Sequence, residues 1–159
     1  MKNALIIFAL GFATIVGAAD LAKSPIFQIR LVLDEPSANS EKMKEQLKAV
    51  DSDKTVYSTV DVQKSVLLDQ NVLESVSIST DYQGKPAIDC KFTSEGKKRF
   101  AEITSQNVGK RIAIIINGKL VTVPKIAAPI TAGNLEITGH FNEQEAKGLA
   151  AKINAAIAK

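Results

Sequence analysis

The stretch RIAIIINGKLVTV, residues 111–123, places two β-rich runs on either side of the dipeptide Asn117-Gly118. Asn-Gly is typical of a two-residue type I′ hairpin turn, because both of its residues tolerate the positive φ angles that this turn requires. The unbroken apolar run 112–116 predicts a strand that is covered on both faces, or nearly so. We therefore expect a hairpin here, with its first strand in the middle of a sheet.

Amphipathic helices are predicted on both sides of this hairpin. Before it, Thr93 can act as the N-cap of a helix with one apolar stripe. That stripe comprises Phe100, Ile103 and, at its far end, Val108. After the hairpin, Asn142 can cap a second helix, and Glu145 three positions later completes a capping box. The apolar residues of this helix recur at helical spacing, at Ala146, Leu149, Ala150, Ile153 and Ile157.

The remaining elements are read from β-branched runs and turn residues. Strands are expected at 26–33, within 55–66, at 76–79, at 87–92 and at 135–138. The turn-rich segment 81–86 joins the third and fourth of these, and 51–54 is expected to be a loop. Between the first two strands, Asn39 or Ser40 can cap a helix with Met43, Leu47 and Val50 at helical spacing. A short helical turn is expected at 68–73.

This order of elements indicates an α+β fold. Because most strands are linked by hairpins and helices are interspersed, we expect an antiparallel or mixed sheet with helices packed on one face. The length of 159 residues suits one domain. We place that domain at residues 26–159, after a linker at 20–25.

The first nineteen residues are interpreted as a signal peptide. Lys2 supplies a positive charge, the apolar run 4–16 has the length of an h-region, and small residues follow it. Cleavage after Ala18 or Ala19 is compatible with these residues, and we favour Ala19. The alternative is an uncleaved membrane anchor, but a spanning helix needs roughly twenty apolar residues. We therefore predict a periplasmic or secreted protein without stable membrane insertion after cleavage.

Charge and cysteine content exclude several classes of partner and bond. Without residues 1–19 the chain has 19 basic and 17 acidic residues, a formal net charge of +2. That charge is too small to imply nucleic acid or an anionic membrane as partner. Cys90 is the only cysteine, so an intramolecular disulfide is impossible. It alternates with Ile88 and Phe92, which predicts a buried thiol.

No catalytic, metal or cofactor site is predicted from the sequence. His140 is the only histidine and lies between a strand and a helix cap, where an exposed loop residue is the usual case. Carboxylate pairs that could bind calcium occur at Asp34-Glu35 and at Asp51 and Asp53, but the second pair lacks the glycine and glutamate of an EF-hand loop. The basic residues 97–99 and 110–111 have no interleaved aromatic residues for base stacking. We therefore expect no enzyme and no cofactor, and leave the binding residues unassigned.

A family resemblance rests on the C-terminal part of the chain. Residues 92–104, FTSEGKKRFAEIT, resemble the F-T-x-E-G-x-x-x-F-A-x-x-T stretch of SecD-type periplasmic head domains. Residues 107–114, NVGKRIAI, are similar to that family's N-x-G-K-x-L-A-I. The segment 117–124 matches its D-G-x-x-x-x-x-P hairpin, with asparagine in place of the usual aspartate. A weaker match upstream extends the resemblance to residues 65–158, and residues 26–64 are interpreted as an N-terminal extension.

The closing part of the family pattern is also present. Its I-x-G-G and I-x-G-x-F-x-x-x-E-A-x-x-L signatures are matched at Ile130, Gly133, Ile137, Gly139, Phe141, Glu145, Ala146 and Leu149. Ala132 stands where the first glycine of the pair is usual. The resemblance implies an α+β head domain that engages polypeptide on the outer face of the membrane. The transmembrane helices that couple proton flow to export are not predicted here, so that motor function does not carry over.

Three functions remain open from the sequence. The first is an exported, non-enzymatic binding module for unfolded or extended polypeptide, acting as a protein-export accessory or chaperone-like factor. The second is a structural or regulatory envelope protein that binds one specific folded partner. The third is an enzyme, of which the only histidine-dependent version would use His140.

Overall fold

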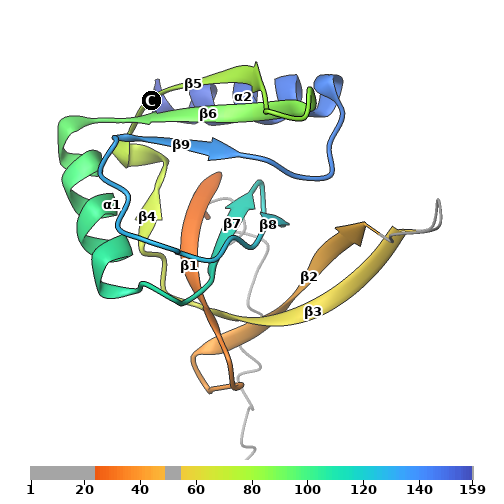
Figure 1. Cartoon of the computed structure of the whole chain (residues 1–159), viewed down its shortest axis with the longest axis vertical. Helices are drawn as coiled ribbons and strands as arrows, with labels where there is room; N and C mark the ends of the chain where they lie inside the picture. Colours follow the sequence, from red (N-terminus) through yellow and green to blue (C-terminus); the bar gives the residue numbers. More distant parts are fainter. Residues whose placement is uncertain (1–23, 49–54, 159) are drawn as a thin grey trace, which may run out of the picture.

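The computed structural model describes residues 24–48 and 55–158, which form two antiparallel β-sheets and two α-helices (Figure 1). The predictions for residues 1–19, most of the linker, Val50, and Asp51 and Asp53 fall outside these residues. The elements are β1 (Phe27–Leu33), β2 (Ser40–Lys48), β3 (Thr55–Gln63), β4 (Leu68–Asp69), the 3-10 turn η2 (Gln70–Val72), β5 (Leu73–Thr80), β6 (Pro86–Phe92), α1 (Ser94–Gln106), β7 (Ile112–Ile116), β8 (Lys119–Thr122), β9 (Asn134–Ile137) and α2 (Glu143–Ile157).

The larger sheet has the strand order β2-β3-β1-β7-β8, and the short strand β4 also pairs with β1. All five residues of β7 are buried. Ile112, Ile114 and Ile116 face the main core, whereas Ala113 and Ile115 face a second, smaller cluster with Val32, Val60 and Val62. The prediction that residues 112–116 form a strand covered on both faces is therefore confirmed.

The turn of the β7–β8 hairpin has the geometry that its sequence requires. Asn117 has φ 52° and Gly118 has φ 74°, so both turn residues lie in the left-handed region. Ile116 and Lys119 are then paired as the strands diverge from the turn. The Asn-Gly prediction is confirmed.

The smaller sheet has the order β5-β6-β9 and carries α2 on its inner face. In Figure 1 this sheet and α2 form the upper layer, and the larger sheet lies below them. Ala146, Ala150 and Ile153 of α2 are buried in the main core with the predicted stripe of β6, which includes Cys90. The α+β class with antiparallel strands is confirmed, and the strands divide into two sheets.

Both predicted helix caps are formed. The Thr93 side chain accepts a hydrogen bond from the Gly96 N–H at 3.0 Å. Asn142 and Glu145 make both bonds of a capping box, at 2.8 and 2.9 Å. Gly96 also allows α1 to approach η2 closely, since a Cβ at this position would lie 2.2 Å from the Val72 carbonyl oxygen.

Three local predictions were wrong or incomplete. Residues 40–48 form strand β2, not a helix, and pair along their whole length with β3. A spacing of four residues puts Met43 and Leu47 on one face of a strand as well as on one face of a helix. Residues 68–73 combine β4 with η2 and are only in part a helical turn. Val108 lies beyond the end of α1 and is 47% exposed.

Candidate functional site

One face of the β2–β3 hairpin carries an apolar pair at the core and a second apolar pair nearer the loop. Met43 is paired with Val60, and Leu47 with Val56, so the four side chains share one face of the hairpin. Val60 is 6% exposed and packs in the second cluster, with Met43 against it. Nearer the loop, Leu47 is 40% and Val56 is 45% exposed. Between these two apolar pairs the same face carries Glu45 and Ser58, which are paired and joined by a side-chain hydrogen bond of 3.4 Å. A polar pair thus separates the buried apolar pair from the exposed one.

The exposed end of this face borders an open groove of about 850 Å³, which we call the hairpin groove. Four segments that are distant in sequence line it: β2, the β5–β6 turn, β8, and the β9–α2 loop with the start of α2. In Figure 1 the β2–β3 hairpin projects to the right, below the β5–β6 turn and the β9–α2 loop. A second hollow of about 370 Å³ continues along β8 and α2. The two hollows share Gln46, Val121, His140, Phe141 and Glu145.

The groove offers both apolar and polar contacts. Tyr82 is 92% exposed at the β5–β6 turn. The carboxylate of Asp81 holds this turn, because its Oδ1 accepts the N–H groups of Gln83 and Lys85, each at 2.8 Å. Phe141, which also lines the groove, packs against the main core. The groove therefore has one apolar wall fixed to the core and an exposed aromatic ring at its mouth.

Both outer strands of the larger sheet also border the groove. Glu45, Gln46 and Leu47 come from β2, and Val121 and Thr122 come from β8. These are the end strands of the order β2-β3-β1-β7-β8, so each has one edge with no partner strand among the described residues. Unpaired strand edges present main-chain N–H and C=O groups to a ligand. Such groups can bind an extended chain without regard to its side chains.

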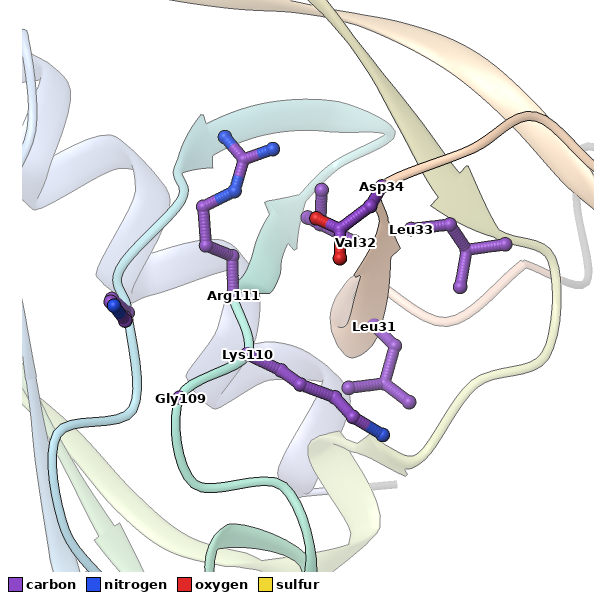
Figure 2. Close-up of a pocket in the computed structure, with 8 residues that line it drawn as sticks. Leu31, Val32, Leu33, Asp34, Gly109, Lys110 and Arg111 are labelled. Carbon is purple, nitrogen blue, oxygen red and sulfur yellow. The ribbon is translucent and has the colours of Figure 1, made fainter.

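A separate hollow, which is basic, lies at the end of β1 and has a volume of about 360 Å³. Figure 2 shows the end of β1, from Leu31 to Asp34, on one wall and Gly109 to Arg111 on the other. Lys125, which is paired with Arg111 in an isolated bridge, also lines it. Within the described ranges Asp34 makes no ion pair with these cations. The hollow thus has three positive charges and one negative charge.

The structure also locates the other residues singled out from the sequence. His140 is exposed in the β9–α2 loop and lines the hairpin groove. Lys110 and Arg111 line the basic hollow, whereas residues 97–99 lie on α1 and do not. Cys90 is fully buried, as predicted, and burial together with the nearby Asp89 raises the pKa of its thiol to about 12.

Sequence reasoning did not find the groove. The spacing of Leu47 predicts a helix stripe, and the segment that contains Tyr82 predicts only a turn. A cluster of three or more His, Cys, Asp or Glu residues suited to a metal does not occur in residues 24–48 and 55–158. Over the same part of the chain, the helices are too short or too polar to cross a bilayer.

Comparison with known proteins gives a consistent result. The family model for the SecDF P1 head subdomain matches residues 42–157. The protein translocase subunit SecD of Acidaminococcus fermentans is 39% identical over 90 residues, which are 57% of this chain and 22% of that protein. SecD of Magnetococcus marinus is 30% identical over 118 residues, 74% of this chain and 22% of that protein. The chain thus spans about a fifth of the length of these relatives.

Solved structures share the fold. SecDF in its Super-membrane-facing form superposes with a TM-score of 0.64 and 27% identity, covering 82% of this chain and 19% of the SecDF chain. A structure of SecDF, a membrane component that enhances protein export, gives a TM-score of 0.63 at 24% identity. That match covers 87% of this chain and 66% of the SecDF chain, and it supports the fold alone.

Proposed function

This chain belongs to the SecDF P1 head subdomain family, and we propose that it serves protein export as a non-enzymatic module that binds extended polypeptide in the hairpin groove. The family resemblance expected from residues 92–104 is confirmed by the family match. Relatives are subunits of a protein translocase, but this chain spans about a fifth of their length. Their activity therefore enters here as part of the proposal.

The observation that carries the proposal is the exposed apolar pair of Leu47 and Val56 on the β2–β3 hairpin. Val60 and Val56 lie on the same face of one strand, four residues apart, and their exposures are 6% and 45%. An exposed apolar pair beside a groove can bury further apolar surface when a ligand binds. Burial of apolar surface contributes roughly 25 cal/mol per Å². Apolar side chains of an unfolded polypeptide are suited to this contact.

The main chain of the ligand also has binding partners in the groove. The free edge of β8 lies at its wall and can hydrogen bond an extended segment. This type of recognition depends little on sequence, because every residue except proline has the same main-chain groups. A module that handles many exported polypeptides requires such tolerance. The groove therefore suits a broad ligand class better than one specific peptide.

Location is the other part of the proposal. We propose that residues 1–19 direct export and are removed after Ala19, which leaves the groove on the outer side of the membrane. Mass spectrometry of the N-terminal peptide from the periplasmic or secreted fraction tests this directly. A first residue at Asp20 supports the proposal, whereas an intact Met1 on a membrane-bound chain contradicts it.

The two tyrosines of the chain provide a matched test of the binding site. Tyr82 lines the groove, whereas Tyr57 is 58% exposed on β3 and is not among the groove residues. Each is replaced by the photoreactive benzoylphenylalanine, and each protein is irradiated with a permanently unfolded, reduced and carboxymethylated polypeptide. We expect strong cross-linking from position 82 and little from position 57.

Two outcomes contradict this proposal. Equal cross-linking from both positions indicates nonspecific contact with exposed aromatic residues. No cross-linking to unfolded chains, together with one folded envelope protein recovered from cells, supports the alternative of a dedicated folded partner. Export and binding are tested separately, so failure of one does not obscure the result for the other.

A further inference from the structure

The outer edge of β5 is occupied by a side chain from α2. β5 is an end strand of the order β5-β6-β9. The side chain of Asn154 reaches this edge and makes two hydrogen bonds with one residue, Val76. Its Oδ1 accepts the Val76 N–H at 2.9 Å, and its Nδ2 donates to the Val76 carbonyl at 2.7 Å. The carboxamide thus takes the place of a peptide group from a neighbouring strand.

The pairing of β5 with β6 determines which main-chain groups of β5 point outward, away from β6. In an antiparallel pair, the main-chain groups of successive residues point alternately toward the partner and away from it. Since both groups of Val76 bind Asn154, the groups of Ile78 and Thr80 also point outward. Asn154 therefore occupies the first of three outward positions, Val76, Ile78 and Thr80, and leaves two of them free. What remains is too short to hold a partner strand firmly.

The part of the edge beyond Asn154 is accessible. Ile78 is 39% exposed, and it lines a hollow of about 220 Å³ with Thr80 and with Glu143 and Ala146 of α2. In the described chain, no side chain is found bonded to the main-chain groups of Ile78. Asn154 is itself exposed, whereas Val76, which it covers, is 6% exposed.

The two sheets protect their end strands in different ways. Five of the nine residues of β2 are charged, and charged residues on an edge oppose pairing with another chain. β5 has the sequence LESVSIST, with one charged residue in eight. It therefore lacks the protection that β2 has, and a neutral edge of this kind is prone to strand addition.

We propose that Asn154 guards the β5 edge, and that without it two copies of the chain associate by pairing their β5 strands. The partner is a second copy because an uncharged edge is complementary to itself in antiparallel pairing. This inference goes beyond the proposed function and does not depend on it.

Two substitutions separate the guarding role from a role in stability. Asn154→Ala and Asn154→Lys both remove the two hydrogen bonds to Val76. Lysine restores a different protection, because a charge on the edge opposes strand pairing. Gln144→Ala, at an exposed position on the same helix, is the control. The readouts are the concentration-dependent mass from light scattering and amide hydrogen exchange at Val76.

We expect exchange at Val76 to become roughly fivefold faster in both Asn154 variants at low protein concentration, from the loss of one hydrogen bond. Only Asn154→Ala should then show a rise toward twice the wild-type mass as its concentration increases, with exchange at Ile78 slowed in the associated form. Gln144→Ala should match the wild type in both readouts. The proposal is overturned if Asn154→Ala keeps the wild-type mass. It is equally overturned if Asn154→Lys associates to the same extent, because association would then follow from lost stability.

Discussion

The two hairpins of the larger sheet differ in how they use their apolar residues. In β7–β8 every residue of the first strand is buried, and its two faces belong to two different clusters. In β2–β3 the apolar face is buried only where it meets the sheet and is exposed toward its loop. The first hairpin holds the fold together, whereas the second projects from it and borders a groove. Substitutions in β7 should therefore affect stability, and substitutions near the β2–β3 loop should affect binding.

The largest expected effect is in β7. Ile114 is 1% exposed and lies in the main core, so Ile114→Ala removes buried methyl groups and leaves a cavity. We expect the free energy of unfolding to fall by about 3 kcal/mol. Urea denaturation followed by far-UV circular dichroism measures this. A loss below about 1 kcal/mol would show that β7 is not central to the fold.

Two valines of β3 test whether this strand changes from part of the core to exposed surface along its length. Val60→Ala should lower the free energy of unfolding by about 2 kcal/mol, because Val60 is 6% exposed and packs in the second cluster. Val56→Ala, on the same face of the same strand, should change it by about 0.5 kcal/mol or less, because Val56 is 45% exposed. Equal losses for the two variants would mean that the hairpin face is uniformly part of the core.

A smaller effect tests the burial of the main core under β6. The folded-state pKa of Cys90 is raised from 9.0 to about 12, so the neutral thiol is favoured in the folded protein. Its contribution to stability is complete below pH 9 and is lost as the pH rises through about 12. Between pH 9 and 10 the wild type should lose about 1 kcal/mol more than Cys90→Ala, which lacks this group. Parallel stability curves for the two proteins would contradict the burial of the thiol.

The comparison of the hairpins also explains what the sequence could predict. Asn117-Gly118 and the isoleucine run act locally, since they specify a turn and a buried strand without reference to distant residues. The caps at Thr93 and Asn142 are local in the same sense. Met43 and Leu47 are different, because their spacing suits a helix or a strand equally well. Pairing with β3 decides between the two, and that contact is not visible in the local pattern.

The division into two sheets and the groove itself are further consequences of long-range pairing. β6 pairs with β9, which follows more than forty residues later, and no local signal assigns that partner. Likewise β1 lies before residues 42–157, the range of the family match, yet pairs with β7 over five residues. The groove is assembled from four separate segments. The sequence therefore predicts the elements well and the site poorly.

Binding provides the most direct test of the central claim, that the exposed end of the β2–β3 face receives extended polypeptide. Leu47 and Ile78 are matched in size and in exposure, at 40% and 39%, but only Leu47 borders the groove. The affinity of each serine variant for a fluorescent, carboxymethylated polypeptide is measured by anisotropy. We predict that Leu47→Ser weakens binding roughly tenfold, because a leucine contact contributes about 1.5 kcal/mol, while Ile78→Ser binds like the wild type. Equal affinities for Leu47→Ser and the wild type, or equal losses in both variants, would contradict the claim.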